Sequence, residues 1–242
     1  GILYIKEIKQ ASKKTLSVDY SSEYSQLDSL AYGTSERPLS VLYFAAYKDG
    51  VFEEPTLIAK GKNFHIGAFD LNQQTGEIYF TKVDIITNWS TGGKSHPRIY
   101  KGNLDTATME LIDVKKVSIK KISDDIGAGH PALSKDGKTL YFSSNLEDGF
   151  GGSDLYSSVL GEDGKWQEPI NLGGHINTSE DEVFPVLNDT VLYYSSNGKA
   201  GFGGLDIFKA NITSKGIEGP VILAAPQNSA ADDFGILLNP NN

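Results

Sequence analysis

Two glycine-rich segments are the parts of the sequence that most resemble a site for chemistry. Gly149–Asp154 reads Gly-Phe-Gly-Gly-Ser-Asp, and Gly201–Asp206 reads Gly-Phe-Gly-Gly-Leu-Asp. Such loops bind phosphate when a helix follows, because the helix N-terminus directs free N–H groups at the anion. Here a β-type run of aromatic and branched residues follows each loop, and aspartate replaces the third glycine of a dinucleotide fingerprint. We therefore exclude a nucleotide site at these loops.

An aspartate ends each loop, Asp154 in the first and Asp206 in the second. A carboxylate in this position can accept hydrogen bonds from loop N–H groups that have no other partner. We therefore interpret both as structural turn residues. The alternative is a calcium site formed by Asp148 and Asp154, because calcium binds clustered carboxylate oxygens. The second loop has Ala200 in place of Asp148, so this cluster is not repeated, and we predict no cofactor.

No histidine or cysteine stands in an array typical of a metal or catalytic site. The chain has no cysteine and four histidines, His65, His96, His130 and His175. Neither His-Glu-x-x-His nor Gly-x-Ser-x-Gly occurs. His130 precedes Pro131 at the expected start of an inner strand, where it would line a channel mouth. We predict no catalytic residue, no bound metal and no enzymatic activity.

The glycine-rich loops belong to a longer repeat. Leu140–Asn145, Leu-Tyr-Phe-Ser-Ser-Asn, recurs as Leu192–Asn197 at the same spacing as the two loops, and fainter copies occur earlier in the chain. Aromatic and β-branched runs separated by Asp-Gly turns are typical of hairpins. Four antiparallel strands in each repeat of roughly 40 to 60 residues indicate a β-propeller blade.

We predict an all-β fold, a β-propeller of four-stranded antiparallel blades that forms a single domain over residues 1–242. Blades are expected at residues 18–63, 64–127, 128–180 and 181–231. Asp233–Asn239 matches the first strand of a further blade, and Gly1–Val18 contains a run like a third strand. We therefore predict five blades, the last shared by both termini, because closure leaves few exposed edges. The initial glycine indicates a fragment of a longer protein.

Charge and hydropathy exclude two classes of partner. The chain has 22 Lys and Arg against 31 Asp and Glu, a net charge of −9, and no basic block. It therefore lacks the positive field that nucleic acid or anionic lipid requires. No apolar run reaches the length of about 18 residues that a spanning helix needs, so we expect no membrane insertion of this fragment.

The acidic residues gather at one end of the predicted blades. In a four-stranded antiparallel blade, the loops between strands two and three lie at the same end as the connections between blades. We call this end the loop face, and we predict that it binds a partner, because loops on a rigid scaffold are frequent binding sites. The alternative is a solvated rim without function. The candidate residues are Asp124, Asp125, His130, Glu180, Asp181, Glu182, Asp232 and Asp233.

Three motifs resemble the propeller repeat of TolB-like proteins and, more closely, of OmpA-associated envelope proteins of Gram-negative bacteria. They lie at residues 140–145, 149–156 and 166–182, and the match covers residues 128–239. The earlier blades depart from it, with His96-Pro97-Arg98 and Arg37-Pro38-Leu39 in the corresponding places. The resemblance implies a periplasmic, non-catalytic protein-binding module, often next to a peptidoglycan-binding OmpA-like domain and sometimes part of type nine secretion machinery.

We therefore predict a protein-interaction scaffold in the bacterial periplasm with cell-envelope partners, associated with the outer membrane through regions outside this fragment. Two alternatives from other classes remain. One is a propeller enzyme, a glycosidase or lyase, which would need two facing carboxylates in a deep pocket. The other is a glycan-binding module, which would need an exposed aromatic platform.

Overall fold

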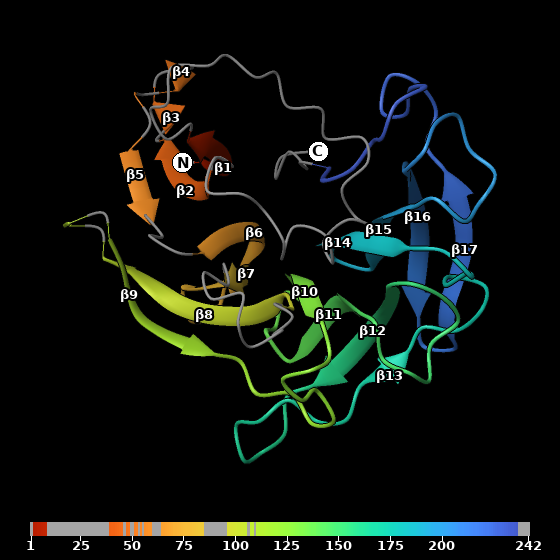
Figure 1. The fold of residues 1–242 in the computed structure, drawn as a ribbon, viewed down its shortest axis with the longest axis horizontal. Helices are drawn as coiled ribbons and strands as arrows, with labels where there is room; N and C mark the ends of the chain where they lie inside the picture. The colour runs from red at the N-terminus through yellow and green to blue at the C-terminus, as the bar shows by residue number, and fades with distance from the viewer. Residues whose placement is uncertain are drawn as a thin grey trace, which may run out of the picture.

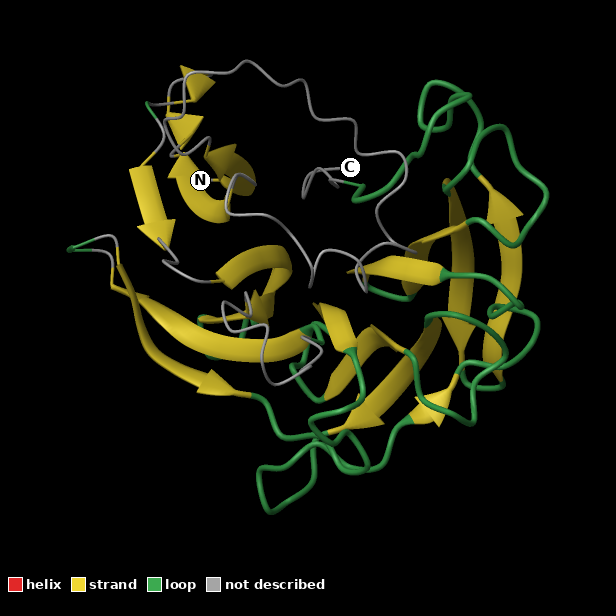
Figure 2. Ribbon diagram, viewed as in Figure 1, coloured by secondary structure: helices red, strands yellow, loops and turns green. Residues whose placement is uncertain are grey.

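The computed structural model describes residues 2–8, 39–45, 47–48, 51–52, 54, 56–59, 64–84, 96–105, 107–108 and 110–236. All regular structure in these ranges is β, and the strands form successive sheets around a common centre (Figures 1 and 2). Among the same residues there is no helix that could cross a membrane.

Each sheet is an antiparallel meander of neighbouring strands. The first consists of β1 (Ile2–Ile8), β2 (Leu39–Ala45) and β5 (Thr56–Ala59), with a small separate hairpin of β3 (Tyr47–Lys48) and β4 (Val51–Phe52). The second consists of β6 (Phe64–Leu71), β7 (Glu77–Asp84), β8 (Arg98–Asp105) and β9 (Glu110–Lys116). The third consists of β10 (Ala128–Leu133), β11 (Thr139–Ser144), β12 (Asp154–Val159) and β13 (Ile170–Asn171). The fourth consists of β14 (Glu182–Asn188), β15 (Val191–Ser196), β16 (Asp206–Thr213) and β17 (Gly216–Ile222).

This arrangement confirms the predicted all-β propeller of four-stranded antiparallel blades. The placement of the N-terminal strand differs from the prediction. β1 pairs along its whole length with β2, Ile2 opposite Ala45 and Ile8 opposite Leu39, so it lies in one sheet with a strand that the sequence assigned to the first blade. Residues 9–18 and 237–239 lie outside the described residues, and a fifth blade stays a prediction.

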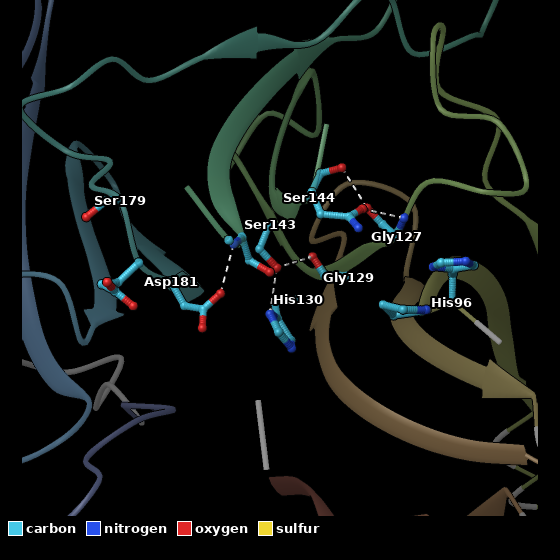
Figure 3. A pocket seen from close by; sticks show the side chains of 13 residues that line it. His96, Gly127, Gly129, His130, Ser143, Ser144, Ser179 and Asp181 are labelled. Carbon is cyan, nitrogen blue, oxygen red and sulfur yellow. Dashed lines mark hydrogen bonds between the residues drawn. The ribbon is translucent and has the colours of Figure 1, made fainter. Parts of the chain in front are cut away.

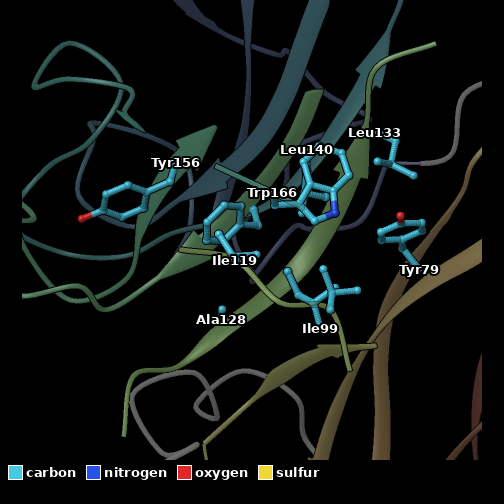
Figure 4. Close-up of a cluster of buried hydrophobic side chains, with 10 residues drawn as sticks. Tyr79, Ile99, Ile119, Ala128, Leu133, Leu140, Tyr156 and Trp166 are labelled. Atoms are coloured by element: carbon cyan, nitrogen blue, oxygen red, sulfur yellow. The ribbon is translucent and has the colours of Figure 1, made fainter. Parts of the chain in front are cut away.

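The core lies between the flat faces of successive blades. Between the second and third sheets, Trp166 meets the ring of Tyr79 edge to face, with centroids 6.3 Å apart (Figure 4). Between the third and fourth sheets, Leu155, Leu192 and Tyr194 form the equivalent layer. Large buried aromatic surfaces dominate such packing. The blades therefore form a rigid frame that fixes the ends of their strands.

The innermost strand of each of these three blades carries a bulge. The pairing register shifts between Ile66 and Phe69, between Gly129 and Ala132, and between Val183 and Val186. A bulge bends the strand and redirects a side chain. These bulges form where the innermost strands pass the centre of the propeller, next to the loop face.

Candidate binding face

A pocket of about 370 Å³ opens on the loop face, where the third blade meets its two neighbours (Figure 3). The second blade contributes the segment that precedes β8, and the third contributes the start of β10, the end of β11 and its glycine-rich loop. The connection to β14 closes one side. The lining residues are His96, Pro97, Gly127, Gly129, His130, Ser143, Ser144, Asn145, Gly152, Ser153, Ser179, Glu180 and Asp181.

The pocket is negatively charged. Among the described residues that line it, Glu180 and Asp181 are the only carboxylates, and there is no lysine or arginine. Burial lowers the pKa of His130 to about 3, so this ring is neutral at physiological pH. The pocket therefore favours a cationic or hydrogen-bond-donating group.

Ser143 and His130 form a hydrogen-bonded pair inside the pocket, with Ser143 Oγ 2.7 Å from His130 Nδ1. A serine–histidine pair can act as nucleophile and base, but an effective base has a pKa near the working pH. With a pKa of about 3, His130 is too weak a base for this role. The next repeat has Ser195 in the same place, where its hydroxyl donates to the carbonyl of Asp233 at 3.0 Å. Ser143 therefore joins β11 to β10 within the third blade, whereas Ser195 joins the fourth blade to the C-terminal segment.

The sequence predicted that His130 lines a channel mouth. It borders the pocket, but the residue is only 5% exposed and its ring lies in a stack of rings. It has a left-handed φ of 50°, and so does Phe184 at 52°, at the bulges of β10 and β14. The two rings stack with centroids 4.3 Å apart, and Phe184 stacks on Phe234 at 4.8 Å. His130 and Phe184 occupy equivalent positions in their blades, and the three rings connect the third blade, the fourth blade and the C-terminal segment.

Asp124 and Asp125 lie at the surface, as predicted, beside the second blade. The carboxylate of Asp124 pairs with Lys116 and, at 3.8 Å, with Arg98. The hydrogen bond from Lys116 is the main cause that holds the pKa of Asp124 below its usual range. The hydroxyl of Ser123 lowers the pKa of Asp125 in the same way. Both carboxylates are thus engaged with their own neighbours.

Asp181 and Asp232 hold the loops. Asp181 Oδ1 accepts a hydrogen bond from the N–H of Ser153 at 2.8 Å, and Asp232 Oδ1 accepts one from Leu205, also at 2.8 Å. Both side chains are only partly exposed. They contribute negative charge to the loop face, and they also fix its backbone.

Glu182 and Asp233 fix the connections that follow the third and fourth blades. Glu182 accepts hydrogen bonds from Thr178 N and Thr178 Oγ1 at 2.6 and 2.8 Å, and from Ser196 Oγ at 2.6 Å. Asp233 accepts the equivalent bond from Ser229 N at 2.6 Å. Glu182 was expected on the binding surface, but it is 0% exposed. Its position opposite Ser196 in the β14–β15 pair directs it into the blade, and burial raises its pKa.

Two asparagines that the sequence analysis missed, Asn177 and Asn228, hold the segments between blades to the preceding blade. Asn177 Oδ1 accepts from Leu155 N at 2.8 Å and its Nδ2 donates to Leu155 O at 3.0 Å. Asn228 does the same with Ile207, at 2.7 and 3.0 Å. Each amide therefore acts as a short β-ladder partner for strand three of its blade. The available signal was their equivalent place in the two repeats.

Asp154 and Asp206 are almost fully buried inside their loops. Asp154 Oδ2 accepts from Phe150 N at 2.5 Å and from the Asn171 amide at 2.8 Å. Asp206 Oδ2 accepts from Phe202 N at 2.8 Å and from Gly203 N at 3.0 Å. The Oδ1 atom of each has no hydrogen-bond partner in the part of the chain described. Within the same residues, no group of three or more His, Asp or Glu could hold a metal ion.

A pair of variants separates the turn interpretation from a calcium site. Asp154→Ala is expected to lower the free energy of unfolding by about 1–3 kcal/mol, because buried donors lose their acceptor. Asp148→Ala is the control: Asp148 is exposed, its one hydrogen bond is a 3.4 Å contact with Tyr156 Oη, and its loss should change stability by no more than about 0.5 kcal/mol. Calorimetry with and without a chelator measures both. Equal losses for the two variants, together with a lower melting temperature of the unmutated protein in chelator, would instead indicate calcium.

No family model and no curated protein matches this chain. Among solved structures, a nidogen/laminin complex is similar with a TM-score of 0.51 and 12% identity, covering 78% of this chain and 60% of that one. TolB from Acinetobacter baumannii has a TM-score of 0.42 and 17% identity, covering 74% and 37%. An α-L-arabinofuranosidase from Lactobacillus brevis has a TM-score of 0.47 and 14% identity, covering 69% and 61%. At these identities the likeness is one of fold, and the nidogen/laminin structure supports the β-propeller.

These structures also correct one prediction. The chain was expected not to be an enzyme, but several of the similar structures are enzymes. A fold hosts unrelated functions, so the propeller gives no basis for excluding catalysis. The prediction of no enzymatic activity is therefore wrong as a deduction from this fold.

Proposed function

We propose that this domain binds a protein partner through the loop face and acts as an interaction scaffold. The observation that carries the proposal is the 370 Å³ pocket, which Glu180 and Asp181 make acidic and which opens among loops of three successive blades. Pockets of about this size commonly receive side chains or small ligands. The pocket provides a place where a partner can be positioned.

The surroundings of the pocket extend its negative charge. Residues 145–153, 172–181, 197–205 and 223–233 contain six carboxylates and one lysine. That lysine, Lys199, donates to the carbonyl of His175 at 3.1 Å. Such a field attracts a basic protein surface and accelerates its association.

The loop face is also rigid. The N–H of Gly152 donates to the carbonyl of Glu180 at 3.0 Å, and the N–H of Glu182 donates to that of Ser153. The glycine-rich loop and the connection between blades therefore support each other. A surface that is already ordered loses little conformational entropy when it binds.

We propose further that the partner belongs to the bacterial cell envelope and that the protein acts in the periplasm. This proposal rests on the motifs at 140–145, 149–156 and 166–182, which resemble OmpA-associated propellers. It extends to an assembly of the outer membrane and peptidoglycan, such as type nine secretion machinery, with attachment through regions outside residues 1–242. The net charge of −9 argues against nucleic acid as the partner.

Site-specific crosslinking tests the proposed face. A photoreactive residue at Glu180 should capture a partner in envelope preparations of the source organism, whereas one at Lys138 or Lys165, in hairpins at the opposite end of the third blade, should not. Capture only from the two hairpin positions would contradict the proposal.

The purified partner then allows a kinetic prediction. Glu147→Lys and Glu180→Lys are expected to slow association severalfold and to change dissociation little, because rim charges act mainly on the on-rate. Both residues are exposed, whereas Asp181 and Asp233 support the backbone and would confound the measurement. Glu162→Lys, in the 161–165 hairpin at the opposite end, is the matched control. Equal effects of the three reversals on the association rate, measured by surface plasmon resonance, would show that only net charge matters.

A further inference from the structure

Two phenylalanines are exposed at the same position of the two glycine-rich loops. Phe150 is 54% exposed and Phe202 is 58% exposed. The N–H of Phe150 donates to Asp154 and that of Phe202 donates to Asp206. Both rings are therefore carried by backbone that the buried carboxylates hold in place.

The loops cannot withdraw to bury these rings. A Cβ atom at Gly151 would clash with the backbone of Ser179, and one at Gly203 would clash with the backbone of Ala231. The backbone of each loop is thus pressed directly against the connection to the next blade. On its inner side, the Phe150 ring lies against Gly174, and more than half of its surface faces solvent.

Packing within the domain does not account for the exposure of both rings. The other exposed pair at equivalent repeat positions, Ile170 and Val221, lies on the outermost strands β13 and β17. The phenylalanines instead project from loops among acidic residues. Aromatic anchors inside a polar rim are the usual composition of a protein interface centre.

We propose that Phe150 and Phe202 are the apolar anchors for a partner protein that places lysine or arginine side chains around an apolar patch. This inference rests on the proposed function and adds the chemistry of the partner. The exposed carboxylates of Glu147, Asp148 and Glu180 supply the complementary charge. A second copy of the domain would bring like charges together, and an anionic membrane would be repelled, so a basic protein surface fits best.

Selection of peptides from a random library tests this chemistry directly. The probe is a phage-displayed library of random dodecapeptides, panned on the unmutated domain. Selected peptides should combine Lys or Arg with large apolar residues. Their affinity, measured by calorimetry, should fall about tenfold or more in the double variant F150A/F202A, as for interface hot spots. The matched double variant I170A/V221A should bind them unchanged.

Further measurements make each outcome decisive. F150L/F202L keeps apolar side chains and should retain most of the binding, which shows that a loss in the alanine variant is not misfolding. Peptides that bind F150A/F202A equally well, or that carry no basic residues, would overturn the inference. A dimer seen by ultracentrifugation, or a chitin oligosaccharide bound, that disappears in F150A/F202A would assign the rings to another occupant. Capture at Glu180 together with unaffected F150A/F202A binding would leave the proposed function standing and remove only the anchors.

Discussion

Replacing Asn177 by aspartate is expected to lower the free energy of unfolding by about 3–5 kcal/mol, the range for an uncompensated buried charge. The side chain is 1% exposed, and its Nδ2 donates to Leu155 O at 3.0 Å and to Asn171 Oδ1 at 2.8 Å. A carboxylate can still accept from Leu155 N, but it cannot donate. It would instead place a negative charge against two oxygen atoms.

The matched control is Asn188→Asp, the same change at an exposed position at the end of β14. It should alter stability by no more than about 0.5 kcal/mol. Urea unfolding at pH 7 measures both variants. Equal losses of unfolding free energy in the two variants would show that the amide of Asn177 does not hold β12 to the segment between the third and fourth blades.

Acidification provides a second test of the same contact. The buried aspartate in the variant would have a folded pKa above its unfolded value of about 3.9, because burial and the two oxygens disfavour its charge. Its stabilising protonated form is lost as the pH rises through that folded pKa. The difference in unfolding free energy between the variant and the unmutated domain should therefore shrink as the pH is lowered towards about 4.

The repeats made the fold predictable where they are strong. The Leu140–Asn145 and Leu192–Asn197 runs became β11 and β15 within a residue of each end, since their alternation and turn signals agree with the tertiary structure. The run at Ile2–Ile8 was harder, because its partner β2 lies more than thirty residues away and its pairing depends on no local signal. The likeness of this run to a third strand therefore did not predict that it pairs with β2.

Roles within the candidate site were less predictable than residue types. Charge and loop position indicated Glu182 as a surface group, but the strand alternation that begins there directs it inward, opposite Ser196. Asn177 was not among the candidate residues of the sequence analysis. Its function depends on a contact with Leu155, which a single sequence does not reveal except through the equivalent pair of Asn228 and Ile207. Repetition of a polar residue was the most informative signal.

Removing residues 232–242 is expected to destabilise the domain by about 4–6 kcal/mol and to abolish a single cooperative transition. The deletion removes the bonds from Leu205 N to Asp232 at 2.8 Å, from Asp233 N to Leu205 O at 2.7 Å and from Ser195 to Asp233 O at 3.0 Å. Each such bond contributes about 1 kcal/mol, and leaving its buried partner unpaired costs more. The stack of Phe234 on Phe184 adds about 0.5–1.5 kcal/mol. The total is a large part of the roughly 5–15 kcal/mol that stabilises a domain.

The deletion also tests whether a further blade begins at Asp233. The contacts of Asn228, Asp232 and Asp233 repeat those of Asn177, Asp181 and Glu182 at the start of β14, which supports a further innermost strand that begins at Asp233. The shortened domain should therefore expose the face of the fourth blade that the C-terminal segment contacts. The amides of Leu205 and Ile207 should then exchange hydrogen much faster than those of the third blade. The point variant Phe234→Ala, which removes only the stack, should retain one transition with a loss of about 1 kcal/mol. If the deletion behaved no worse than this point variant in calorimetry, the C-terminal segment would be an appendage, and the idea that it begins another blade would have to be abandoned.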